Sequence, residues 1–224
     1  MSCGKQIVKL ESKYSINNYY GNNTQCNVIK YGNTPILISA PHSIKQKRNG
    51  VIKSHEFYTG AIAEYLAHKL CCSVITKQEL DINKYNDDAN YEDTNCNYKR
   101  TVRDFLEYSD ISLFIDIHGL SGNKDSIIDI CTDNGLNIIE TEYWLIDSLV
   151  NMIKNKFIGG NASVNKYFKA DKQYILSKWV HDTFDISAIQ LEINGRYRWF
   201  DGNTKIQSEL LVNILYQWLS NYKK

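Results

Sequence analysis

Two histidines in the sequence each follow an apolar run. His42 comes after Pro35–Ala40 (PILISA) and Pro41, and His118 comes directly after Ser112–Ile117 (SLFIDI). Continuous apolar runs of this length are typical of central strands that are covered on both faces. In open α/β sheets, functional side chains gather at the carboxyl ends of such strands, so both imidazoles are expected at one edge. Because neutral imidazole is a common zinc ligand, the pair predicts a metal site.

A third metal ligand is needed, since catalytic zinc sites typically have three protein ligands and one open position. Glu56, in Ser54-His55-Glu56, lies at the start of the segment 55–70, whose apolar spacing predicts a helix. A carboxylate at a helix start can face the strand ends, but it is also a favourable charge at that position, with Ser54 as N-cap. His55 is the alternative ligand. The spacing alone leaves Glu56 and His55 open.

Two further acids lie inside apolar strands. Asp116 precedes His118 by two residues, so both share a strand face, which predicts that Asp116 orients the histidine or contacts a substrate. Glu192 lies in the predicted strand Ala188–Ile193 (AIQLEI), where an unpaired carboxylate is costly to bury. It is either paired with a nearby arginine or acts as a general base that activates water and then protonates a leaving amine.

Arginines near these segments are candidates for binding a substrate carboxylate, because the guanidinium fork matches carboxylate geometry. The candidates are Arg100, Arg103, Arg196 and Arg198. Arg100 and Arg103 are three residues apart on a predicted helix, a spacing that also fits a solvated helix face. Arg196 and Arg198 also fit a structural salt bridge with Glu192.

The elements that must position these residues alternate along the chain. Strands are predicted at 27–31, 35–40, 73–76, 112–117, 127–132 and 188–193, and helices at 55–70, 99–108, 138–157, 173–183 and 205–222. This pattern predicts an α/β fold, a three-layer αβα sandwich with a mixed, mostly parallel central sheet. The Asp/Asn-rich segment 80–97 is predicted to be a long surface loop, and such loops often lie at a site.

One domain is expected over residues 1–224, because the chain has only two prolines and no Gly/Ser-rich linker. Within it, the polar segment 1–26 is predicted to be peripheral, with a short strand and a surface loop. The 26 basic and 25 acidic residues nearly balance, which gives no electrostatic case for nucleic acid or an anionic membrane as partner. The six cysteines form no CxxC pair, so free thiols are expected. With no signal-like or membrane-spanning apolar run, a cytoplasmic protein is predicted.

Together, these motifs resemble the N-formylglutamate amidohydrolase family. PHS after one apolar strand, DIHG after another and QLEINGRYR near the C-terminus follow the family's order and spacing. The segment HEFYTGAIAEYLA and the Asp/Asn-rich loop before YKR also fit, so the resemblance runs from about residue 35 to residue 200. It implies a phosphorylase/hydrolase-like fold, akin to zinc carboxypeptidases.

The resemblance also implies an activity and residue roles. Members of the family cleave the amide bond of N-formylglutamate or related small N-acyl amino acids by attack of metal-activated water. The resemblance assigns His42, Glu56 and His118 as ligands of one zinc ion, Glu192 as the general base and Arg196 as the residue that binds the substrate carboxylate. The sequence departs from the family pattern after PHS, where a glycine and a nearby proline are usual, and at Gly195, which separates EIN from the arginine.

Two other functions fit the same residues. A cell-wall amidase of the N-acetylmuramoyl-L-alanine type has a histidine, a helix-borne glutamate and a strand-borne histidine in this order, although its members are typically exported. A binding protein that keeps the fold without catalysis is the second alternative. The two-histidine, one-carboxylate set would also suit iron, manganese or cobalt.

Overall fold

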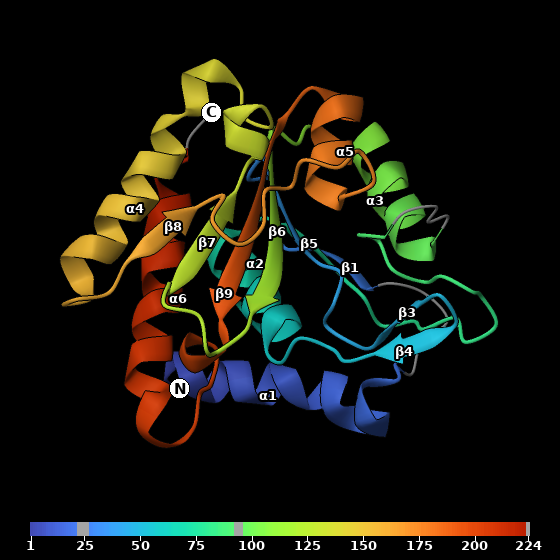
Figure 1. Cartoon of the computed structure of the whole chain (residues 1–224), viewed down its shortest axis with the longest axis horizontal. Coiled ribbons are helices and arrows are strands. Elements are labelled where there is room, and N and C mark those ends of the chain that lie inside the picture. Colours follow the sequence, from blue (N-terminus) through green and yellow to red (C-terminus); the bar gives the residue numbers. More distant parts are fainter. Residues whose placement is uncertain (22–26, 92–95, 223–224) are drawn as a thin grey trace.

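A seven-stranded mixed sheet forms the centre of the structure, a computed structural model that describes residues 1–21, 27–91 and 96–222 (Figure 1). In spatial order its strands are β1 (Asn27–Lys30), β5 (Ser73–Thr76), β2 (Ile36–Ala40), β6 (Leu113–Leu120), β9 (Ser187–Asn194), β7 (Ile128–Cys131) and β8 (Ala162–Val164). The strands β5, β2, β6 and β9 are parallel, and β8 is parallel to β7. β1 is antiparallel to β5, and β7 is antiparallel to β9. The predicted mixed, mostly parallel sheet is confirmed.

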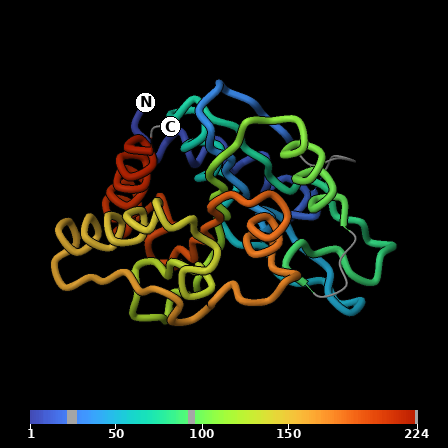
Figure 2. Tube along the Cα trace, turned by 90° about the horizontal axis from the view of Figure 1, so that it is seen from above, coloured from blue at the N-terminus to red at the C-terminus, as the bar shows by residue number. Residues whose placement is uncertain are grey.

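Helices cover both faces of this sheet. One face packs against α2 (Thr59–Leu70), α4 (Trp144–Lys156) and α6 (Lys205–Ser220), with α1 (Cys3–Ser15) packed on α2 and α6. The other face packs against α3 (Asn97–Glu107) and α5 (Leu176–Phe184). Figure 1 shows α4 and α6 to the left of the sheet and α3 to the right, and Figure 2 shows α6 and α3 on opposite sides. The predicted three-layer αβα sandwich is therefore confirmed.

The alternation of side chains along the central strands places polar groups at one end of the sheet. Phe114 of β6 packs into the core beneath α3 and α5, and Asp116 and His118 follow at every second residue on the same face. β9 repeats the pattern with Gln190 and Glu192, which are the register partners of Asp116 and His118. In Figure 1 the arrowheads of β6 and β9 lie at the same, lower end of the sheet. Polar residues of two strands thus meet at the predicted edge.

The N-terminal segment differs from the prediction. The prediction of a strand and a loop is wrong for residues 3–15. These residues form the helix α1, which starts after the N-cap Ser2. Ile7 and Tyr14, seven residues apart on one helix face, are fully buried in the main core, so this segment is not peripheral. Residues 22–26 of the same prediction, and 92–95 of the predicted loop, lie outside the described residues.

A hairpin and the start of a helix also differ from the prediction. The hairpin of β3 (Gln46–Arg48) and β4 (Val51–Lys53) was not predicted, although its turn, Asn49-Gly50, has positive φ angles of 51° and 77° and is a strong hairpin signal. The helix predicted from residue 138 begins at Trp144, because Glu140–Glu142 form a separate 3₁₀ turn. In the described part of the chain, no helix is long and apolar enough to cross a bilayer.

Candidate metal centre

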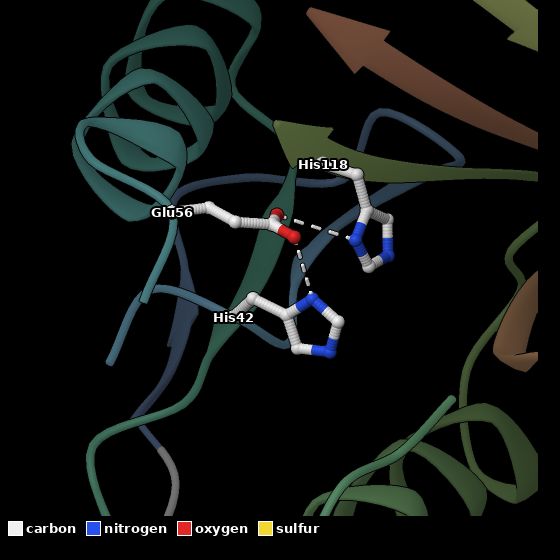
Figure 3. Close-up of side chains that lie close together, drawn as sticks. All are labelled: His42, Glu56 and His118. Atoms are coloured by element: carbon white, nitrogen blue, oxygen red, sulfur yellow. Dashed lines mark hydrogen bonds and ion pairs between the residues drawn. The ribbon is translucent and has the colours of Figure 1, made fainter. Parts of the chain in front are cut away.

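Three side chains converge at the carboxyl end of the parallel strands (Figure 3). Nδ1 of His42 lies 2.8 Å from Oε1 of Glu56, and Nδ1 of His118 lies 3.3 Å from Oε2 of the same carboxylate. One potential ligand atom from each of the three residues lies within 4.8 Å of the others. His42 follows β2 and His118 lies in the neighbouring β6, as the strand-end argument predicted.

Glu56 reaches the histidines from a loop. The prediction that it opens a helix is wrong, because α2 begins at Thr59, after Tyr58 in the left-handed conformation (φ 65°). The Glu56 backbone N–H donates to the carbonyl of His42 at 2.9 Å, and its Oε2 accepts from the Gly119 N–H at 2.8 Å. These contacts hold the carboxylate between the two strands.

Gly119 permits this close approach. A Cβ atom at this position would lie 2.6 Å from Nη2 of Arg198 and 3.0 Å from the Glu56 Cβ, so a larger residue would push both side chains away. The glycine of the DIHG motif is therefore needed for Glu56, the third candidate ligand, to pack in this position.

A second layer of acids orients the imidazoles. Nε2 of His42 lies 3.0 Å from Oδ1 of Asp88, and Nε2 of His118 lies 3.0 Å from Oδ2 of Asp116. A carboxylate that accepts from Nε2–H leaves Nδ1 as the nitrogen that would bind a metal, once the proton shared with Glu56 is displaced. For His118, the Asn90 amide nitrogen also lies 2.8 Å from Nε2. Both Nδ1 atoms therefore face Glu56 as potential ligands. The predicted orienting contact of Asp116 is present in the structure.

The pKa values of His42, His118 and Glu56 are all shifted in the direction that favours the charged form of each side chain. Burial lowers the pKa of His42, but the Asp88 and Glu56 carboxylates outweigh it and raise the pKa to about 9. For His118, burial is likewise outweighed by Asp116 and Glu56, and its pKa is raised well above the ordinary value. Burial would raise the pKa of Glu56, but the two imidazoles lower it well below its ordinary value. Carboxylates around a pair of nitrogen donors suit a divalent cation, whose binding would displace these protons.

Glu192 lies beside this cluster on β9, as the register partner of His118. Its side chain is buried, and Nε2 of Gln190 donates to its Oε1 at 2.8 Å. Burial is the largest influence on its pKa and, although His118 lowers it, the net effect raises the pKa to about 7. A carboxyl group that titrates near neutrality can accept a proton and return it.

A cavity of about 230 Å³ opens onto these groups. Its lining combines the three candidate ligands and Glu192 with three other polar side chains, two apolar side chains and one glycine. The lining residues are His42, Arg48, Glu56, Asn90, His118, Gly119, Phe168, Ile175, Gln190 and Glu192. The volume suits a small molecule rather than a folded partner.

The structure does not bring the predicted arginines to this cavity. Arg196 and Arg100 are exposed and are not among its lining residues. Arg103 places its guanidinium over the ring of Trp179. Arg198 is buried, but its guanidinium donates to the backbone carbonyls of three residues: Ile193 at 2.7 Å, Leu120 at 3.4 Å, and Phe57.

The rival ligand His55 also lies elsewhere. Its ring stacks on Tyr19 with centroids 3.4 Å apart and meets the edge of Phe57. His55 is absent from the lining of the cavity, so the structure brings Glu56, and not His55, to the two histidines.

Sequence reasoning missed Arg48, Asp88 and Asn90. Arg48 comes from the hairpin strand β3, and its Nε forms an ion pair with Asp88. Asp88 and Asn90 belong to the Asp/Asn-rich loop, which buried Lys77 holds in place through the carbonyl and carboxylate of Asp87. The Asn-Gly turn and the length of the loop were the two available signals.

Comparisons with known proteins support the fold. No family model matches the chain, and no curated protein matches it. Among solved structures, N-formylglutamate amidohydrolase from Ralstonia eutropha JMP134 has a TM-score of 0.61 at 9% identity, with 89% of this chain and 98% of that chain covered. Gene product Atu2144 from Agrobacterium tumefaciens has a TM-score of 0.60 at 10% identity, with 93% and 100% covered.

A metallo-carboxypeptidase from Burkholderia cenocepacia is also similar, with a TM-score of 0.53 at 13% identity and 98% of this chain and 68% of that chain covered. At these identities the comparisons establish the fold. The chain has the zinc carboxypeptidase-like, phosphorylase/hydrolase-like fold that the sequence motifs implied.

Proposed function

We propose that the protein is a metal-dependent hydrolase that cleaves the amide bond of a small N-acyl amino acid of the N-formylglutamate type. The observation that supports this most is the convergence of His42, Glu56 and His118 beside the buried Glu192 in one small cavity. The fold shared with a known N-formylglutamate amidohydrolase agrees with the proposal.

The donor set fits one divalent ion. Two imidazole nitrogens with one carboxylate form a common catalytic zinc set, which leaves a further position open. Asp88 and Asp116 orient His42 and His118 as such a set requires. When bound, the ion would act as a Lewis acid on the amide carbonyl and lower the pKa of water.

Glu192 would supply the proton transfers. The group lies in the same cavity as the candidate ligands, and its pKa of about 7 leaves both protonation states accessible at neutral pH. It would take a proton from the attacking water and give it to the leaving nitrogen. Cleavage of N-formylglutamate in this way consumes one water and yields formate and glutamate.

Arg48 would bind the substrate carboxylate, in place of the predicted Arg196, Arg198 and Arg100. Among the described residues that line the cavity, Arg48 is the one arginine or lysine. Its Nε is held by Asp88, while no described residue accepts from its two terminal nitrogens. Those nitrogens form the edge of the guanidinium that binds a carboxylate with two parallel hydrogen bonds.

The test combines metal analysis with a substrate screen. Purified protein is loaded with zinc, its metal content is measured, and N-acyl amino acids and short peptidoglycan fragments are tested for hydrolysis. We expect one ion per chain and release of a carboxylate from N-formylglutamate or a close analogue. His118→Ala should lose the ion, whereas His68→Ala, at an exposed position of α2, should keep it.

Two outcomes would contradict the proposal. If the protein holds no stoichiometric metal after zinc addition, the proposed metal centre is wrong. Hydrolysis of peptidoglycan fragments without hydrolysis of any N-acyl amino acid would instead favour the cell-wall amidase.

A further inference from the structure

Gln190 lies on the floor of the cavity next to Glu192. Both residues come from β9, two positions apart, so their side chains share one face of the sheet. Gln190 is 4% exposed and lines the cavity. Its Nε2 donates to Oε1 of Glu192 at 2.8 Å, which fixes the direction of the side-chain amide.

The carbonyl oxygen of that amide has no partner. Oε1 of Gln190 is buried and accepts no hydrogen bond from the described residues. The same holds for Oδ1 of Asp116, the register partner of Gln190 on β6, whose other oxygen faces His118. Of these two residues, Gln190 lines the cavity and Asp116 lies behind it. A buried acceptor left without a donor is unfavourable, so the position of Gln190 is complementary to an N–H group.

We propose that Gln190 is a specificity-determining residue whose Oε1 accepts a hydrogen bond from the N–H of the scissile amide. This inference rests on the proposed function. Because Gln190 also contacts Glu192, the hydrogen bond would hold the leaving nitrogen beside the group that protonates it. The site would then favour secondary amides over esters and tertiary amides, which lack this N–H.

A pair of substrates isolates this contact. N-formyl-L-glutamate carries the N–H, and its ester isostere, O-formyl-2-hydroxyglutarate, has an oxygen in its place. Hydrolysis of either consumes one water and releases formate, leaving glutamate or 2-hydroxyglutarate, and in both Glu192 would take a proton from the attacking water. The ratio of kcat/KM for the amide to kcat/KM for the ester therefore reports on the N–H contact.

The variant is Gln190→Met, which keeps the length of the side chain and removes both the oxygen and the Nε2–H that donates to Glu192. Gln46→Met is the matched control, because Gln46 is also 4% exposed with an unpartnered Oε1 but does not line the cavity. We expect Gln190→Met to lower the amide-to-ester ratio about tenfold, as for the loss of one hydrogen bond, and Gln46→Met to leave it unchanged. An unchanged ratio in Gln190→Met, or an equal fall in both variants, would overturn the proposal.

A binding measurement separates this proposal from the hydrolytic function. If wild-type protein hydrolyses neither probe, the proposed function fails, and the two probes are titrated calorimetrically into zinc-loaded wild type and Gln190→Met. Tighter binding of the amide by wild type, lost in the variant, would support the role of Gln190 on its own. Equal affinity for both probes, or binding of neither, would overturn it.

Discussion

Glu56 and Glu11 are two largely buried carboxylates in opposite electrostatic surroundings. Glu56 faces two imidazoles, which lower its pKa well below the ordinary value although burial raises it. Glu11, on α1, faces neutral donors: its Oε1 accepts from the Tyr58 N–H at 3.0 Å and from the Tyr19 hydroxyl at 2.9 Å. Burial is the largest influence on Glu11 and raises its pKa to about 7.

The contrast separates a charged site from a structural contact. The surroundings of Glu56 keep it ionised and leave its oxygens facing nitrogen donors, as a metal ligand requires. The contacts of Glu11 fix Tyr58, at the end of the loop that carries Glu56, and they function equally well when the acid is neutral. The predictions below test this pair first, then Glu192 and Arg48 in the cavity, and finally the contribution of Glu11 to stability.

The same substitution at both positions should give opposite results. Glu56→Gln removes a charged ligand, so we expect loss of stoichiometric zinc and a fall in hydrolysis of roughly 10³-fold, because the ion contributes several kcal/mol. Glu11→Gln keeps an acceptor oxygen for Tyr58 and should retain zinc and activity. Elemental analysis and steady-state kinetics of both variants check this. Zinc retained at full occupancy in Glu56→Gln would remove Glu56 from the ligand set.

Glu192 shares the high pKa of Glu11 but lies in the cavity, so its charge state should matter for turnover. We expect Glu192→Gln to keep the metal and to lower kcat by roughly 10²- to 10⁴-fold, the usual contribution of a general base. Metal content and kcat are measured on the same preparation. A variant with the metal and full activity would assign the proton transfers to another group, and absence of activity in wild type as well would favour a binding protein.

Arg48 is expected to act on substrate binding through its terminal nitrogens. Arg48→Met keeps much of the side-chain length and removes the charge, so KM for N-formylglutamate should rise about 10- to 100-fold, as for loss of a charged hydrogen-bonded pair. Arg196→Met, at an exposed position outside the cavity, is the control and should change KM little. The reverse pattern would restore the carboxylate-binding role that the family resemblance assigns to Arg196.

The sequence was sufficient for the strand-borne half of this site. His42 and His118 follow long apolar runs, and parallel strands bring their carboxyl ends to one edge whatever the details of packing. Glu192 was found because a carboxylate within an apolar strand is costly unless it has a role. The three-layer fold followed from the same alternation of strands and helices.

The loop-borne half could not be predicted, because tertiary contacts determine it. Glu56 is placed by the His42 carbonyl and by the backbone of Gly119, neither of which the local pattern of 55–70 reveals. Arg48 is placed by a hairpin turn and by Asp88, forty residues further along the chain. The predicted arginines lie within α3 or just after β9, both of which were correctly predicted as elements, but spacing does not determine where their side chains point.

The smallest effect concerns the stability of the fold and tests Glu11 directly. Its folded-state pKa of about 7 is above the ordinary 4.5, so between these values the folded state binds a proton that the unfolded state has released. The free energy of unfolding should therefore fall as pH rises from 4.5 to 7, by up to about 1.4 kcal/mol per pH unit from this group. Glu11→Gln should flatten that slope in denaturant titrations, whereas Glu107→Gln, at an exposed position, should not. An unchanged slope in Glu11→Gln would show that this carboxylate is ionised in the fold, and the contrast with Glu56 would fail.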